Sequence, residues 1–253
     1  MLLAIDIGNS RTKLGLYRGS RLIAAASFLT SQHQSRKDVL PSINPMSQKA
    51  KTKVNNITDA AVCSVVPKQS KIISSLLKSQ FNIRPLLISG KLDIGMKIRY
   101  KHPAQLGADR LCSAVAAYDK FGGPCIVIDI GTATKYEVIS KRGEHLGGAI
   151  ALGIESALNA LHSRTAQLPK IVLRVPRKVI GTSTAECIQS GNFFGAIDAI
   201  DGMIVRLRKI AGKNSKVILT GGFAQLIARH SRNIDYVEPH LVLEGARIIY
   251  GRK

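Results

Sequence analysis

A strand-like run that ends in Asp-Ile-Gly and leads into a turn of small polar residues occurs twice in this chain of 253 residues. The two copies read 4-AIDIGNSRTKLGLYRGS-20 and 127-VIDIGTATKYEVISKRGE-144. In such a turn glycine lets the backbone approach a phosphate, and amides and hydroxyls donate hydrogen bonds to its oxygens. The Asp carboxylate can hold a hydrated Mg²⁺ or another cation. A single turn of this kind is common in hairpins, but two inside a repeat predict a paired grip on the phosphates of a nucleotide.

Two further segments carry residues suited to the same chemistry. Asp109 and Arg110, in 107-GADR-110, stand where a helix is expected to begin. Asp109 is therefore either a carboxylate that stabilises the helix end or a base that accepts the proton of an attacking hydroxyl. Arg110 would then hold an anionic substrate. The segment 220-TGG-222 is either an ordinary strand-to-helix turn or a close approach to adenine and ribose. The chain contains neither G-x-x-x-x-G-K-[ST] nor G-x-G-x-x-G, so the two commonest nucleotide-binding folds are not supported.

The elements that must position these residues follow from apolar periodicity and from breaks at Gly and Pro. The first three strands are joined by tight turns and predict an antiparallel meander. The expected strands are 2–8, 11–18, 21–28, 60–66, 85–89, 125–130 and 217–222, with another strand after Thr134-Lys135 in the second copy of the repeat. The expected helices are 68–80, 107–120, 153–163 and 184–210. The repeat predicts two lobes of the same topology. We place their boundary at 121-FGGP-124, which gives residues 1–121 and 122–253, with the amphipathic segment 241–251 in the second lobe.

Composition limits the class of protein. Apolar residues make up 45% of the chain, which excludes wholesale disorder. The start MLLAIDIGNS lacks the basic stretch of a secretory signal, and no apolar run approaches the roughly 20 residues of a membrane span. The four cysteines are far apart, with no C-x-x-C pair and no His at zinc-ligand spacing, and are interpreted as reduced thiols. These features predict a cytoplasmic protein with no membrane partner.

The motifs, taken in order, resemble the type III pantothenate kinase family from end to end. They are DIGNS (6–10), SVVP (64–67), GADR (107–110), DIGTAT (129–134), GGAI (147–150), GTST (181–184), SGNFFG (190–195) and TGG (220–222). The resemblance implies an α/β fold of two duplicated actin-like (ribonuclease H-like) lobes with mixed sheets flanked by helices and a nucleotide cleft between them. The implied reaction is ATP-dependent phosphorylation of pantothenate to 4'-phosphopantothenate, the first step toward coenzyme A.

The family also implies roles for individual residues. Asp109 matches the catalytic base, and Asp129 matches a site for a monovalent cation, usually K⁺ or NH₄⁺. The positions that match the pantothenate pocket are Tyr100, Gly107, Ala108, Asp109, Arg110 and Thr184. Those that match ATP contacts are Asp6, on the Mg²⁺ side, with Ile7, Gly8, Asn9, Ser10, Arg11, Thr12, Lys13 and Thr132. The family is dimeric, and its pocket is completed near the subunit interface.

Some positions depart from the family pattern. Lys135 stands where a second Thr is usual, and Glu137 stands where an Asp is usual. Leu152 replaces a common Pro, and Lys101-His102 replaces a more acidic pair. Lys135 either adds a contact to a phosphate or displaces the monovalent cation.

Other functions remain open at this point. The 37 Lys and Arg against 16 Asp and Glu give a net charge of +21, which favours polyanions, so a nucleic-acid-binding or regulatory protein on the same fold is the main alternative. Against it, aromatic residues are only 5%, and the basic residues are scattered, with mild concentrations in 31–58 and 170–178. A sugar or acetate kinase and an inactive paralogue are the remaining alternatives.

Overall fold

A computed structural model describes residues 1–30, 43–48, 51, 53 and 56–253 of the chain. The described chain divides into two compact units. Unit 1 comprises Met1–Lys120 and His240–Lys253, and unit 2 comprises Phe121–Pro239. Most of the basic stretch 31–58 lies outside the described residues.

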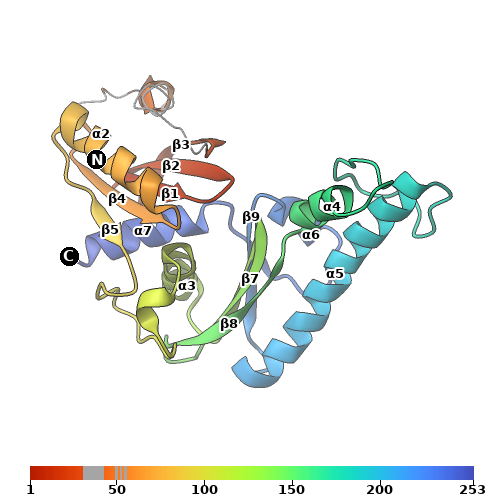
Figure 1. Cartoon of the computed structure of the whole chain (residues 1–253). Helices are drawn as coiled ribbons and strands as arrows, with labels where there is room; N and C mark the ends of the chain where they lie inside the picture. The colour runs from red at the N-terminus through yellow and green to blue at the C-terminus, as the bar shows by residue number, and fades with distance from the viewer. Residues whose placement is uncertain (31–42, 49–50, 52, 54–55) are drawn as a thin grey trace. The chain divides into compact units, whose positions relative to one another are not determined.

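Unit 1 is built on a five-stranded mixed sheet (Figure 1). Its strands are β1 (Leu2–Ile7), β2 (Arg11–Arg18), β3 (Arg21–Leu29), β4 (Asp59–Ser64) and β5 (Leu86–Ile88), in the order β3-β2-β1-β4-β5. Strands β1 to β3 form the predicted antiparallel meander, and β4 runs parallel to β1. The turn from β2 to β3 uses Gly19 at a φ of 59°, a backbone conformation that other residues rarely adopt.

The helices of unit 1 cover the apolar side chains of this sheet. Helix α2 (Pro67–Phe81) starts with a proline at its first turn, and its Ile73, Leu76 and Leu77 pack into one core with Leu3 and Ile5 of β1. A short 3-10 helix (Pro103–Gln105) precedes α3 (Ala108–Phe121), whose inner face is rich in buried alanines. Helices α2 and α3 lie close to their predicted ranges, 68–80 and 107–120.

The C-terminal helix α7 (Leu241–Gly251) corrects the predicted division into lobes. We expected this segment in the second lobe, but α7 lies against β1, β4 and β2 of unit 1. The hydroxyl of Tyr250 donates a hydrogen bond to the Asp59 carboxylate, and Arg252 Nη1 donates to the Ile94 carbonyl at 2.6 Å. The physical reason is that the first sheet needs apolar cover on both faces, and the buried stripe of α7 supplies it.

Unit 2 repeats the topology of unit 1. Its strands are β6 (Cys125–Ile130), β7 (Ala133–Ile139), β8 (His145–Leu152), β9 (Lys216–Gly221) and β10 (Tyr236–Val237), in the order β10-β9-β6-β7-β8. Numbered within each unit, both sheets read 3-2-1-4-5. Asp6 pairs with Lys13 across β1 and β2, and Asp129 pairs with Lys135 across β6 and β7. The predicted duplication into two lobes with mixed sheets is therefore confirmed, including the alignment of the two Thr-Lys pairs.

Three helices complete unit 2 (Figure 1): α4 (Ile154–Ser163), α5 (Thr184–Ala211) and α6 (Ala224–Ala228). Helix α5 contributes Phe193, Ile197 and Ile204 to a core shared with Ile126 and Ile128 of β6. Although α5 has 28 residues, no helix within the described ranges is both long and apolar enough to cross a membrane.

Candidate functional site

Asp6 lies beside a buried thiol of unit 1, Cys63, on the neighbouring strand. Asp6, near the end of β1, is 7% exposed, and Cys63 pairs with it in register on the parallel strand β4. Cys63 Sγ points to Asp6 Oδ1 at 4.0 Å. The pKa of the Cys63 thiol is raised well above its ordinary value, chiefly by burial, then by Cys112 and by the charges of Asp6 and Asp109. The charges of Asp6 and Asp109 therefore both act on the Cys63 thiol.

Asp109 is fixed at the start of helix α3. Its Oδ1 accepts a hydrogen bond from the backbone N–H of Arg110 at 2.9 Å. A Cβ at Gly107 would lie 2.5 Å from this oxygen and 3.6 Å from Val65 Cγ1, so any other residue at position 107 would require the carboxylate to shift. Val65 is itself held by a hydrogen bond from its N–H to the Ile7 carbonyl at 3.1 Å. Two of the sequence motifs, SVVP and GADR, thus meet at Gly107.

Arg110, the residue after Asp109, forms a cation–π pair with Tyr100. The Arg110 guanidinium carbon is 5.5 Å from the centroid of the Tyr100 ring, and Arg110 is only 7% exposed. A cation over an aromatic face is stabilised by about 0.5–2 kcal/mol, and guanidinium is the most weakly hydrated side-chain cation. The arrangement suits a planar, two-point grip on a carboxylate.

The first predicted phosphate turn is an exposed hairpin tip. The N–H of Gly8 donates to the Arg11 carbonyl at 3.0 Å, and this bond leaves Asn9 and Ser10 exposed. Thr12 differs from the expectation for this turn. Its side chain is fully buried, and its hydroxyl oxygen lies 2.8 Å from that of Thr30. We had expected the Thr12 hydroxyl to donate to phosphate, but the alternation of β2 turns it toward the interior.

The equivalent turn in unit 2 holds Thr132. Its carbonyl accepts hydrogen bonds from Gly153 N–H at 3.1 Å and from Ser156 Oγ at 2.7 Å, at the start of α4. The N–H of Gly131 donates to the Ala133 carbonyl at 3.1 Å. Thr132 is exposed, so its side chain is accessible to a ligand.

Asp129, the predicted cation ligand, is already paired. Lys135 Nζ lies 2.7 Å from Asp129 Oδ2, and both side chains are less than one-fifth exposed. On the other side, a Cβ at Gly221 would lie 2.6 Å from Asp129 Oδ1, and Gly221 has a φ of +100°. Two like unit charges at 4 Å repel by about 4 kcal/mol at an effective dielectric of about 20. The residues around Asp129 therefore do not fit a second monovalent cation at the same carboxylate.

Thr184 lies in unit 2 at the first turn of α5, where it is exposed. The residues before it cap this helix. Ser183 Oγ accepts from Glu186 N–H at 3.3 Å, and Glu186 Oε2 accepts from Thr182 N–H at 2.7 Å and Thr182 Oγ1 at 2.9 Å. The hydrogen bonds from Thr182 lower the pKa of Glu186. Part of the GTST motif thus has a structural role, and Tyr100, Asp109 and Arg110 belong to the other unit.

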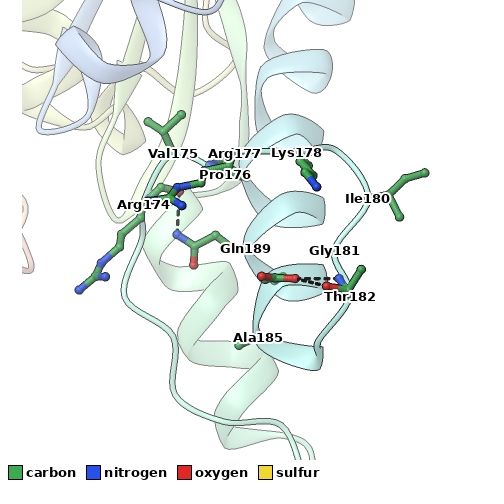
Figure 2. A pocket seen from close by; sticks show the side chains of 11 residues that line it. Arg174, Val175, Pro176, Arg177, Lys178, Ile180, Gly181, Thr182, Ala185 and Gln189 are labelled. Carbon is green, nitrogen blue, oxygen red and sulfur yellow. Dashed lines mark hydrogen bonds between the residues drawn. The ribbon is translucent and has the colours of Figure 1, made fainter.

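A pocket of about 440 Å³ adjoins this end of α5 (Figure 2). Gln189 Nε2 donates to the Arg174 carbonyl at 2.7 Å and thereby ties the preceding loop to the helix. Arg174, Arg177 and Lys178 give the pocket a cationic lining, with Glu186 as its acidic member. Sequence reasoning recorded only the basic stretch 170–178 and not the pocket.

Two buried polar features were missed. Cys63 was interpreted only as a reduced thiol, although it directly precedes SVVP (64–67), one of the motifs shared with the family. His145 Nε2 lies 2.7 Å from Glu137 Oε2, and both side chains are buried. The sequence signal for this pair was weak, because the two residues face each other only across the hairpin of β7 and β8.

Comparison with known sequences gives full-length relatives. The family model described as type III pantothenate kinase matches residues 2–206. The chain is 38% identical to the type III pantothenate kinase of Solibacter usitatus, over all of this chain and 97% of that protein. It is also 38% identical to that of Moorella thermoacetica, over all of this chain and 99% of that protein.

Solved structures share the fold at low identity. A conserved putative Baf family transcriptional activator from Campylobacter jejuni matches with a TM-score of 0.57 and 22% identity, over 99% of this chain and 98% of that one. The activator of 2-hydroxyisocaproyl-CoA dehydratase from Clostridium difficile, solved with bound ADPNP, gives 0.57 and 14%, over 98% and 93%. At these identities the likeness shows the two-lobed architecture alone.

Proposed function

Because the chain belongs to the type III pantothenate kinase family and so phosphorylates pantothenate with ATP, we propose roles for its residues in that transfer. The observation that carries the proposal is that Asp109 is fixed at the start of α3, directly before Arg110, whose guanidinium lies over the Tyr100 ring. Asp6 and Asp109 also both act on the Cys63 thiol through their charges. In phosphoryl transfer to an alcohol, a carboxylate recurs in two roles, as a ligand of the metal ion and as the group that accepts the proton of the acceptor hydroxyl.

Asp109 is the proposed base. In the reaction the pantothenate hydroxyl oxygen bonds to the γ-phosphorus while the bond to the β–γ bridging oxygen breaks and ADP leaves. An aspartate is too weak a base to ionise an alcohol beforehand, so it orients the hydroxyl and takes the proton as attack proceeds. Gly107 and the Arg110 amide support this role, because they fix the carboxylate at the helix start.

Arg110 is proposed to bind the carboxylate at the other end of pantothenate. Its guanidinium is largely buried and positioned over Tyr100. A buried cation that meets an anionic substrate gains a charge-assisted hydrogen bond, which contributes about 1.5–3 kcal/mol. Gly107 and Ala108 are proposed to line the pantothenate pocket with their backbone.

ATP contacts are assigned to the two repeated turns. The exposed tips Asn9 and Ser10, with Lys13 and Arg11, would meet phosphates from unit 1, and Thr132 would do so from unit 2. Asp6 offers a carboxylate oxygen, and Mg²⁺ characteristically takes one or two carboxylates together with substrate phosphates. The residues therefore fit Mg²⁺, whose contribution would be to neutralise charge on the transferred phosphoryl group.

We propose a cytoplasmic homodimer in which Thr184 completes the pantothenate pocket near the subunit interface. Support comes from large apolar side chains that unit 2 exposes on β8 and before α5: Ile150, Leu152, Val172, Val179 and Ile180. Exposed apolar side chains that form a contiguous patch are typical of association surfaces. Light scattering should give the mass of a dimer, and Ile180→Glu should shift it toward the monomer. A monomeric native protein would contradict this part of the proposal.

The nucleic-acid-binding alternative has only the net charge in its favour. The likeness to the C. jejuni protein is at 22% identity and shows the fold alone. The direct test of function is incubation with ATP, Mg²⁺ and pantothenate, followed by mass spectrometry of the product. We expect 4'-phosphopantothenate and ADP in equal amounts. Salt-sensitive DNA binding without turnover would favour the alternative.

A further inference from the structure

The environment of Asp129 differs from that of a site open to a free cation. Lys135 Nζ is 2.7 Å from Asp129 Oδ2, with the two side chains 18% and 17% exposed. The carboxylate therefore has a cation at hydrogen-bonding distance that is supplied by the chain itself.

The backbone holds this ion pair in place. Asp129 and Lys135 are directly opposite each other in the antiparallel pair β6–β7, and opposite residues project from the same face of a sheet. The shared register continues from Ile130–Thr134 to Cys125–Ile139. The ammonium thus reaches Asp129 from a regular strand, and a tethered group has a much higher effective concentration than an ion in solution.

The opposite side of Asp129 is closed by backbone. Gly221 lies next to Ile130 in the parallel pair β6–β9, and a Cβ there would come 2.6 Å from Asp129 Oδ1. Phe223 N–H approaches the Ile130 carbonyl at 3.5 Å and helps to hold this turn against β6. A free cation would have to share this confined carboxylate with the Lys135 ammonium, and the two positive charges would repel each other.

We propose that the Lys135 ammonium is a built-in monovalent cation at Asp129, so that phosphoryl transfer by this enzyme does not depend on K⁺ or NH₄⁺. The inference rests on the proposed function of the site. The ammonium carries the same single charge as either ion and neutralises Asp129 at the end of β6, close to the turn of Gly131 and Thr132. It thereby lowers the repulsion between this carboxylate and the phosphates of ATP.

The experiment compares the wild type with Lys135→Thr, which introduces the residue usual in the family. ADP release is measured with ATP, Mg²⁺ and pantothenate in Na⁺, K⁺ or tetramethylammonium chloride at one ionic strength. We expect the same wild-type rate in all three salts. For Lys135→Thr we expect a low rate in Na⁺ and a rise of about tenfold or more in K⁺, the usual size of an effector coupling. Lys141→Thr, in the exposed turn after β7, is the matched control and should behave as the wild type.

A second readout does not require turnover. The affinity for a non-hydrolysable ATP analogue is measured by calorimetry, and the melting temperature is recorded, each in Na⁺ and in K⁺. For the wild type and for Lys135→Arg, which keeps a cation, the affinity and the melting temperature should be the same in Na⁺ and in K⁺. For Lys135→Thr, both the affinity and the melting temperature should be higher in K⁺ than in Na⁺. The melting curves also show whether each variant is folded.

A wild-type enzyme that needs K⁺ for turnover or for nucleotide binding would overturn the inference. So would a folded Lys135→Thr enzyme that is active and indifferent to K⁺. Failure of the proposed function looks different: the wild type would show no pantothenate-dependent turnover in any salt. The binding and melting measurements would then still report whether K⁺ acts on the wild type.

Discussion

The Arg110 guanidinium carbon lies 5.5 Å from the centroid of the Tyr100 ring, and the arginine is almost fully buried. A buried cation is costly unless it is paired or meets an anion. Arg110 directly follows Asp109 in α3, so the proposed carboxylate-binding residue and the proposed base are adjacent in one helix.

Arg110→Lys should weaken pantothenate binding selectively. Lysine keeps the charge but loses the planar fork and the stacking on Tyr100. We expect KM for pantothenate to rise about 10–100-fold, which corresponds to the loss of about 1.5–3 kcal/mol of a charge-assisted hydrogen bond. KM for ATP should change little.

The control for this prediction is pantothenol, in which an alcohol replaces the carboxylate. The wild type should prefer pantothenate strongly, and Arg110→Lys should prefer it much less. Arg84→Lys, at an exposed position of the same unit, should preserve the wild-type preference. Equal preference in the wild type and Arg110→Lys would show that Arg110 does not contact the carboxylate.

Gly107→Ala should impair catalysis through the position of Asp109. The added Cβ would lie 2.5 Å from Asp109 Oδ1 and force the carboxylate to move. A displacement of about 1 Å at a reacting group costs on the order of 10²-fold in rate, so kcat should fall by about that factor. Gly191→Ala is the matched control, because nothing lies within 4 Å of a Cβ there. Comparable kcat for the two variants would contradict the proposed constraint.

Tyr250→Phe should destabilise unit 1, because it removes the hydrogen bond from α7 to Asp59 of β4. The expected loss is about 0.5–1.5 kcal/mol at neutral pH. Tyr118→Phe on α3 is the control.

The effect of Tyr250→Phe should depend on pH in a definite direction. The hydroxyl of Tyr250 lowers the pKa of Asp59, and Asp59 raises the pKa of Tyr250 to about 12. Because the pKa of Asp59 is lower in the folded protein than in the unfolded chain, the hydrogen bond stabilises the fold at pH values above the unfolded-state pKa. This stabilisation is lost as the pH falls through the folded-state pKa. A raised phenol pKa gives stability that is present below about 10 and is lost toward 12. The difference between wild type and variant, measured by urea unfolding, should therefore shrink below about pH 4 and above about pH 10. A difference that stays constant would exclude this coupling.

The four cysteines should differ in reactivity. Cys63, Cys112 and Cys125 are buried, and Cys187 is exposed. Burial raises the pKa of Cys63 well above its ordinary value and that of Cys125 to about 12. Because the thiolate is the reactive form, Ellman's reagent at pH 8 should titrate one thiol in the native protein and four in urea. Cys187→Ser should abolish the fast reaction, and a second fast thiol in the native protein would contradict the described burial.

The repeat could be predicted from the sequence because both copies combine the same strand alternation with the same turn chemistry. Asp6 and Asp129 were correctly placed at matching strand ends, and the paired registers confirm it. The sequence also departs from the family pattern at Lys135. The sequence alone left its role open because it does not show whether the side chains of Lys135 and Asp129 meet.

Other features depend on tertiary packing that local patterns do not carry. The stripe of α7 indicated a buried helix but not which sheet it covers, so α7 was assigned to the wrong lobe. Strand β8 was not anticipated because Gly147 and Gly148 interrupt its apolar pattern, and β10 has only two residues. Thr12 was expected to contact phosphate, but its register on β2 buries it against Thr30.

The central claim is that Asp109 acts on the pantothenate hydroxyl, and the most direct test is steady-state ADP release by Asp109→Asn. Asp119→Asn, an exposed position on the same helix, serves as the control. We predict that kcat falls about 10²–10⁴-fold for Asp109→Asn, with KM for both substrates little changed, because the lost interaction forms in the transition state. Asp119→Asn should retain the wild-type rate. An Asp109→Asn enzyme with an unchanged kcat would contradict the account.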